Sequence, residues 1–183
     1  MSTTFPRTRS SRRGYSIEQV EDFLEDARRA YSTDPGAPVA VSSASIRTTA
    51  FAMQKGGYSA AHVDAALERL EDAFASRERD RAIQLQGDQA WYTEARTVAQ
   101  AILSRLSRPD GHKFDRVGAL GKGYHRKDVD AFAARLVAYF QEGRPMNIDE
   151  VRTAVFRPKS GGYREAQVDL LLDQVVNVML AVR

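Results

Sequence analysis

The chain contains 183 residues, of which 43% are hydrophobic and 28% are charged, and its formal net charge is +3. This composition is typical of an ordinary globular protein, and no apolar run is long enough to cross a membrane or to form a secretory signal behind the N-terminal arginines. The absence of cysteine excludes disulfides and thiolate metal sites, so we expect a cytoplasmic protein of one or two domains.

The N-terminal part begins with residues 1–13, which hold four arginines and no acid and are expected to form a solvated arm, with Phe5 and Pro6 docked on the core. Apolar residues at three- and four-residue spacing then predict an amphipathic helix over residues 17–31. Residues 32–43 contain two prolines and a glycine and are expected to form a loop. A short helix over residues 46–51, capped by Ser42 or Ser43, precedes a second amphipathic helix that begins near Ala60.

The rest of the chain repeats this alternation of long and short helices. Residues 77–81 are charged on all sides, and their mixed signs predict a solvated helical bridge. A break at residues 87–88 precedes an amphipathic helix over residues 91–106. A further helix follows Tyr124 and ends at Gly143, and Asn147 or Asp149 begins a short helix over residues 151–156. The last helix runs from Glu165 almost to the end.

Four Gly-Tyr pairs organise the sequence, and each has a valine five places after the tyrosine and an acid directly after the valine. Random placement of the 12 glycines and 7 tyrosines would give about half of one such pair, so the sequence contains an internal repeat. The repeated residues are Gly14, Tyr15, Val20, Gly57, Tyr58, Val63, Gly123, Tyr124, Val129, Gly162, Tyr163 and Val168.

The tyrosine-to-valine spacing predicts how each helix begins. If the residue after the tyrosine is the N-cap, the tyrosine and the valine occupy the two positions that form a hydrophobic staple. Ser16 and Ser59 are good N-caps, and Ser16 with Gln19 predicts a capping box, whereas the caps of the third and fourth copies are poor. The glycine before each tyrosine is expected to take a positive φ.

The recurring polar residues do not form a catalytic or metal-binding pattern. The acids Glu21, Asp64, Asp130 and Asp169 fall in the first turns of the four helices, where a solvated or arginine-paired acid is expected, and the tyrosine hydroxyls are expected at the surface. The three histidines lack metal-ligand spacing, and the glycines of residues 118–123 do not form a phosphate loop. We therefore expect no catalytic residue, cofactor or metal, and no enzyme activity.

The motif resembles the N-terminal domain of the DivIVA family, in which a phenylalanine precedes Gly-Tyr and an apolar helix follows Val-Asp. Phe51 and Phe156 each lie seven residues before a repeat tyrosine, and the four copies together resemble DivIVA-domain repeat proteins over essentially the whole chain. The resemblance implies a cytoplasmic, non-enzymatic protein of bacterial cell division or polar growth. The family's best-known members bind curved membrane through an aromatic-basic pair before the Gly-Tyr and oligomerise through a long coiled coil; here no aromatic residue stands in the two positions before any of the four glycines.

The copies also pair along the chain, because copies 2 and 4 share the phenylalanine at seven residues and an Arg-Thr just before it. The predicted fold is therefore all-α, with four repeated helix-start units arranged as two duplicated modules joined by helices. The expected domains are residues 1–76, a helical connector over residues 77–111, and residues 112–183. The two modules could close separately, pack on each other, or be completed by a second chain in a homodimer.

The function expected from these features is that of a non-catalytic scaffold or adaptor that contacts division or envelope-growth proteins. The alternative is a peripheral binder of anionic membrane, with weak surface contact through basic loops. Binding to nucleic acid is a distant third, because the charges of residues 77–81 are mixed. The residues expected to contact an anionic partner are Arg7, Arg9, Arg12, Arg13, Lys55 and Lys122.

Overall fold

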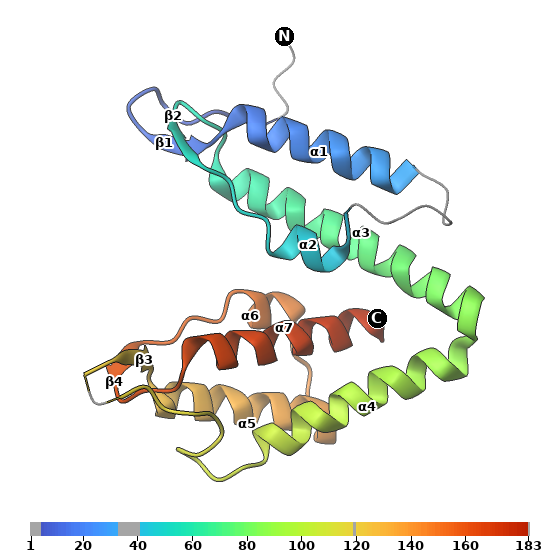
Figure 1. Ribbon diagram of the computed structural model, residues 1–183, viewed down its shortest axis with the longest axis vertical. Coiled ribbons are helices and arrows are strands. Elements are labelled where there is room, and N and C mark those ends of the chain that lie inside the picture. The colour runs from blue at the N-terminus through green and yellow to red at the C-terminus, as the bar shows by residue number, and fades with distance from the viewer. Residues whose placement is uncertain (1–4, 33–40, 119, 183) are drawn as a thin grey trace. The chain divides into compact units, whose positions relative to one another are not determined.

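The computed structural model describes residues 5–32, 41–118 and 120–182, and these are predominantly helical, as expected (Figure 1). The first elements are β1 (Arg13–Tyr15), α1 (Ile17–Ser32), α2 (Ser43–Arg47), β2 (Met53–Lys55) and α3 (Ala60–Gln86). They are followed by α4 (Asp88–Leu106), β3 (Lys122–Tyr124), α5 (Arg126–Glu142), α6 (Ile148–Arg152), β4 (Pro158–Ser160) and α7 (Glu165–Ala181).

The chain divides into two compact units, Met1–Leu85 and Gln86–Arg183, each of which is described by itself. The first unit contains strand, helix, short helix, strand and long helix in that order, and the second unit shows the same order after α4. Residues 77–81 are helical, as expected, and lie within α3. The expected break is Gly87, which has a φ of 85° and separates α3 from α4.

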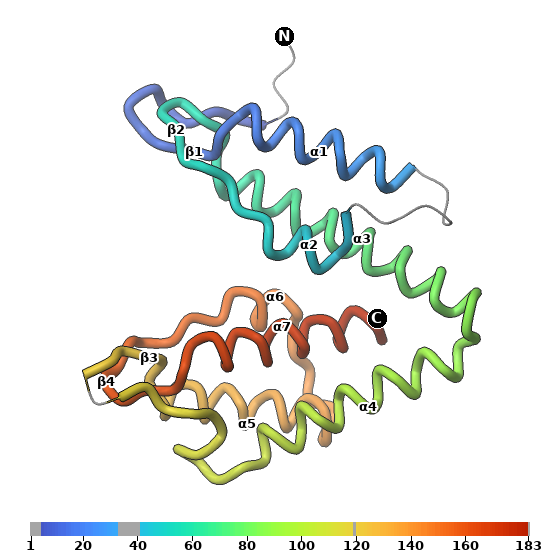
Figure 2. Tube along the Cα trace, viewed as in Figure 1, coloured from blue at the N-terminus to red at the C-terminus, as the bar shows by residue number. Residues whose placement is uncertain are grey.

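A two-stranded antiparallel sheet lies at the end of each unit where the long helices begin (Figure 2). Gly14 pairs with Gln54 in the first unit, and Gly123 pairs with Lys159 in the second. These strands were not expected from the sequence. Each has only three residues, which is too short for an alternating pattern of apolar and polar residues to be recognised.

The two Gly-Tyr pairs of each unit also lie against each other. The backbone amide of Tyr15 donates to the carbonyl of Tyr58 at 2.9 Å, and the amide of Tyr58 donates back at 3.0 Å. Tyr124 and Tyr163 exchange the same two hydrogen bonds at 3.0 and 2.9 Å. We call this antiparallel pairing of two Gly-Tyr pairs the crossed base of a unit.

The crossed base explains the four glycines, and the expected positive φ was wrong. None of these four glycines has a positive φ; the neighbouring Gly56 and Gly161 do, at 64° each. A Cβ atom on Gly14 would lie 2.2 Å from the carbonyl oxygen of Tyr58, and one on Gly123 would lie 2.1 Å from that of Tyr163. The positions therefore require glycine because two backbones approach too closely for any side chain.

All four long helices of the repeat begin where the sequence placed them, one residue after the predicted N-cap. The capping box predicted for Ser16 and Gln19 was wrong. The hydroxyl of Ser16 lies 3.5 Å from the amide of Gln19, while the side chain of Gln19 accepts a hydrogen bond from the amide of Ala52 at 2.8 Å. Gln19 therefore ties α1 to the segment that leads into β2.

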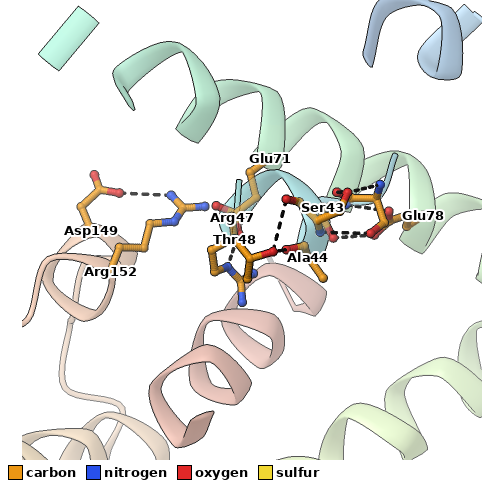
Figure 3. A network of polar contacts seen from close by, with 10 residues as sticks. Ser43, Ala44, Arg47, Thr48, Glu71, Glu78, Asp149 and Arg152 are labelled. Atoms are coloured by element: carbon orange, nitrogen blue, oxygen red, sulfur yellow. Dashed lines mark hydrogen bonds and ion pairs between the residues drawn. The ribbon is translucent and has the colours of Figure 1, made fainter. Parts of the chain in front are cut away.

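The short helices end earlier than predicted, at Arg47 and Arg152. In the first unit α2 is fastened to α3 by Arg47, which binds the buried Glu71 at 2.5 Å, and by Ser43, whose hydroxyl donates to Glu78 at 2.6 Å (Figure 3). In the second unit Arg152 pairs with Asp149 of α6 itself at 3.2 Å. Because α2 and α6 end at these residues, Phe51 and Phe156 lie beyond the short helices and pack against tyrosines of the crossed base.

Replacing Gly123 by alanine should lower the free energy of unfolding by about 2–3 kcal/mol, because the new methyl group must push two hydrogen-bonded backbones apart. Gly118→Ala is the matched control, because a Cβ atom there meets nothing within 4 Å, and it should change stability by less than about 0.5 kcal/mol. Urea unfolding followed by circular dichroism measures both variants. Equal stability of the two variants would contradict the close-approach explanation.

Candidate functional site

In each unit one repeat tyrosine binds the recurring acid of the other copy. The hydroxyl of Tyr58 donates to Glu21 at 2.5 Å, and that of Tyr163 donates to Asp130 at 2.8 Å. In the opposite direction, Asp64 and Asp169 lie close enough to Tyr15 and Tyr124 for their charges to raise the pKa values of these tyrosines. The crossed base therefore joins two helices through one tyrosine–carboxylate hydrogen bond in each unit.

The expectation of surface hydroxyls was wrong for Tyr58 and Tyr163, both of which are fully buried. The expectation of a solvated or arginine-paired acid was wrong for Asp130, whereas Glu21 is exposed. Asp130 is 7% exposed and also accepts a hydrogen bond from the amide of Gly111 at 2.8 Å. The sequence did carry a signal, because an acid recurs six residues after each of the four repeat tyrosines. That spacing fixes the position of the acid on its own helix but does not reveal that its partner comes from another copy.

Burial and the neighbouring carboxylates keep Tyr15, Tyr124 and Tyr163 neutral. Burial raises the pKa of Tyr163 to about 12, and the hydrogen bond to Asp130 acts in the same direction. The pKa values of Tyr15 and Tyr124 are also raised, first by burial and then by the charges of Asp64 and Asp169. The hydroxyls therefore act as hydrogen-bond donors at neutral pH, and their arrangement favours a structural role over acid–base chemistry.

Phenylalanines pack against the tyrosine rings in the same order in both units. Phe5 contacts Tyr58, and Phe114 contacts Tyr163, each with ring centroids 5.4 Å apart. Phe51 packs against Tyr15 at 5.5 Å, and in the second unit Phe156 packs against Tyr124 at 5.2 Å. The phenylalanines before copies 1 and 3 thus cover the tyrosines of copies 2 and 4. The phenylalanines before copies 2 and 4 cover the tyrosines of copies 1 and 3.

Five of the six cations proposed to contact an anionic partner lie around the crossed base of the first unit. Arg13 pairs with Lys55 across β1 and β2, and Arg12 accepts a backbone hydrogen bond from Gly56 at 3.0 Å. The preceding arm is bound to the unit, since Thr8 donates to the carbonyl of Gly57 at 2.8 Å. We call the group the basic end; its members are Arg7, Arg9, Arg12, Arg13 and Lys55.

All five side chains of the basic end are exposed, and none has an ion pair within the part of the chain that the structure describes. Residues 5–17 and 48–63, which build this end, contain no acid. A cluster of this kind has no internal partner for its charge, and it attracts anionic groups from solution.

The sixth proposed cation, Lys122, lies in the second unit on β3 and is exposed. Its surroundings differ from the basic end. Arg157 forms two hydrogen bonds with Asp128, at 2.8 and 2.6 Å, which hold the pKa of that carboxyl well below its usual range. Arg116 donates to the carbonyl of Gly111 at 2.8 Å. In the second unit, Arg157 and Arg116 are therefore both bound to groups of the unit itself.

The described residues hold no group of three or more histidine, cysteine or acidic side chains arranged to bind a metal ion. Within the same ranges, no helix is both long enough and apolar enough to span a bilayer. The imidazole of His62 lies 2.9 Å from the hydroxyl of Ser59, and that of His125 lies 3.0 Å from Asp128. The glycine-rich stretch 118–123 includes residue 119, which lies outside the described residues.

Comparison of the chain with protein-family models, with curated proteins and with solved structures gives no match.

Replacing Tyr163 by phenylalanine removes the donor to the buried Asp130 and should cost about 1–3 kcal/mol at pH 7. The variant should also lose the part of the pH dependence of stability that comes from the Tyr163 hydroxyl. Because the pKa of Tyr163 is about 12 in the folded protein and 10.0 as its ordinary value, the wild type holds this contribution below pH 10 and loses it as the pH rises towards 12. Urea unfolding at a series of pH values from 8 to 12 measures both effects.

The exposed Tyr92 provides the control, because Tyr92→Phe should leave both the stability and its pH profile unchanged. An identical loss of stability above pH 10 in wild type and in Tyr163→Phe would contradict the burial of a neutral hydroxyl at this position.

Proposed function

We propose that the protein is a non-catalytic cytoplasmic adaptor of the DivIVA-like type, which acts through protein–protein contacts in bacterial cell division or polar growth. We further propose that its four Gly-Tyr motifs are repeated helix-start units, arranged as two duplicated modules. The matching order of elements in the two units supports the duplication, as does the matching set of ring contacts. Partners are proteins of the division or envelope-growth machinery.

The adaptor proposal is supported by the contacts that the repeated residues make with one another. Glycines, tyrosine hydroxyls and carboxylates of the motif bind one another at the crossed base, where they hold pairs of helices at a common origin. A motif used in this way builds a scaffold, and function then resides on the outer faces of the helices. This arrangement supports a binding protein better than an enzyme.

The adaptor proposal predicts partners whose capture depends on the fold. We expect crosslinking and affinity purification from the source cells to recover division or envelope-growth proteins with wild type and with Gly118→Ala. Gly123→Ala should recover much less, because it disturbs the second unit. The proposal is wrong if wild type and Gly123→Ala recover the same proteins, or if the folded wild type recovers none.

A second candidate function, peripheral binding to anionic membrane, is favoured by the basic end. Five exposed cations without internal partners lie on one small surface, and each is worth about 1 kcal/mol near an anionic bilayer. No aromatic residue stands in the two positions before any of the four repeat glycines. Membrane binding would therefore depend on charge alone, and the affinity would fall as salt screens that charge.

Membrane binding can be measured by sedimentation with vesicles of phosphatidylserine and phosphatidylcholine. Replacing the five cations of the basic end by glutamine should weaken binding at least about a hundredfold at low salt. The matched control replaces five cations elsewhere, namely Arg81, Arg96, Arg105, Arg108 and Arg144. Equal loss in the two variants would show that net charge alone is responsible, and absence of pelleting with wild type at low salt removes this candidate.

A further inference from the structure

The second unit has a helix that the first unit lacks. Helix α4 packs against both α5 and α7, and its residues Ile102 and Leu106 are 1% and 2% exposed. The ammonium group of Lys113 fixes the end of α4 by donating to the carbonyls of Leu106 at 2.8 Å and Arg108 at 2.6 Å. In the first unit, the described residues include α1, α2 and α3 but no helix that corresponds to α4.

The place where such a helix would lie follows from matching the two units at their repeat valines. Val20 corresponds to Val129, so Glu21 of α1 corresponds to Asp130 of α5. Asp130 receives the hydrogen bond from Gly111, which belongs to the loop that follows α4. The α4 side of α5 therefore corresponds to the Glu21 side of α1.

A hollow of about 530 Å³ lies along this side of α1. It runs from Glu21 to Ser32, which is about 16 Å at the rise of an α-helix. The remaining lining residues of the hollow are Leu24, Glu25, Arg28 and Arg29.

A comparison of α3 with α7 indicates the same position for an α4-like helix in the first unit. Glu71 and Glu78 of α3 bind α2, and helical spacing places Ala66, Arg69 and Ala73 on the opposite flank of the buried Val63 and Phe74. The corresponding residues of α7 include Gln174 and Val178. Those two line a cavity with Trp91 and Ala95 of α4, so this flank of α7 is the one that α4 covers.

The chemistry of the two faces differs. Positions that are Val137 and Gln174 in the second unit are Arg28 and Arg69 in the first. Both arginines are exposed, and their guanidinium groups have no ion pair in the described part of the chain. Arg29, in contrast, is paired with Glu25 at 3.2 Å. The face thus combines three partly buried apolar residues, Leu24, Ala66 and Ala73, with two cations that no described acid binds. Its two acids already have partners, since Glu21 accepts from Tyr58 and Glu25 pairs with Arg29.

We propose that this face of the first unit, formed by α1 and α3, binds an amphipathic helix of a partner protein in the position that α4 takes in the second unit. The apolar stripe of that helix lies on Leu24, Ala66 and Ala73, and its acidic residues bind Arg28 and Arg69. The proposal rests on the adaptor function and names the chemistry of its partner. The two arginines select an acidic helix, because a neutral helix such as α4 would leave them without a partner.

The test uses photocrosslinking in the source cells with the full-length chain. The crosslinking amino acid p-benzoylphenylalanine replaces Glu25 in the hollow or, as a control, Asp22 on the exposed surface of α1. We expect Glu25 to crosslink to one segment of a partner that carries acids on either side of a helical apolar stripe, and Asp22 not to do so. Mass spectrometry of the crosslinked peptide identifies the segment.

Charge variants then test the recognition itself with the purified partner segment as the probe. Arg28→Glu combined with Arg69→Glu should weaken binding at least about tenfold, whereas the two arginine-to-lysine changes should retain most of it. Replacing the acids of the partner segment by lysine should restore binding to the glutamate variant. Circular dichroism confirms that each variant is folded.

Three outcomes overturn the proposal: crosslinks from Glu25 that map to another copy of this chain, crosslinks to a segment without acids, or binding that charge reversal leaves unchanged. If general crosslinking still recovers partners while Glu25 recovers none, the adaptor function stands and this docking face is wrong. If neither recovers a partner, both proposals fail.

Discussion

The structure depends on the antiparallel contact between two Gly-Tyr backbones in each unit. Four hydrogen bonds of 2.9–3.0 Å hold these contacts, and the carbonyl oxygens come so close that a Cβ atom at any of the four glycines would lie within 2.5 Å of one. The contact places Tyr58 and Tyr163 over the start of the other helix in their unit, where Glu21 and Asp130 accept hydrogen bonds from their hydroxyls. In each unit, the crossed base therefore holds the starts of two long helices together, and the remaining elements pack against the faces of these helices.

The crossed base shows why some features were predictable and others were not. Helix starts at Ile17, Ala60, Arg126 and Glu165 follow from local chemistry, so a staple and an N-cap were enough to place them. The partner of each tyrosine is a long-range property, and spacing along the chain does not specify it. The glycines were misinterpreted for a related reason, because a positive φ and a close backbone approach both require glycine and the sequence does not distinguish them.

The two units share this base but differ in what surrounds it. Helix α2 is held by the buried pair of Arg47 and Glu71, whereas the position of Glu71 is Val176 in α7. Among the described residues, the cations beside β1 and β2 have no acidic partner, but Arg157 beside β4 is bound to Asp128. A shared framework with different outer faces is suited to binding different partners with each half, which is the property that an adaptor needs.

The two proposed contacts of the first unit respond differently to ionic strength, and this difference follows from where their residues lie. The basic end depends on exposed charges, whose interactions are screened beyond about 8 Å at physiological salt. The hollow along α1 has an apolar component at Leu24, which salt does not weaken, and it extends away from the basic end along the helix. The exposed Arg28 and Arg69 are screened as well, so rising salt should weaken both contacts, and the apolar component should make the loss smaller at the hollow.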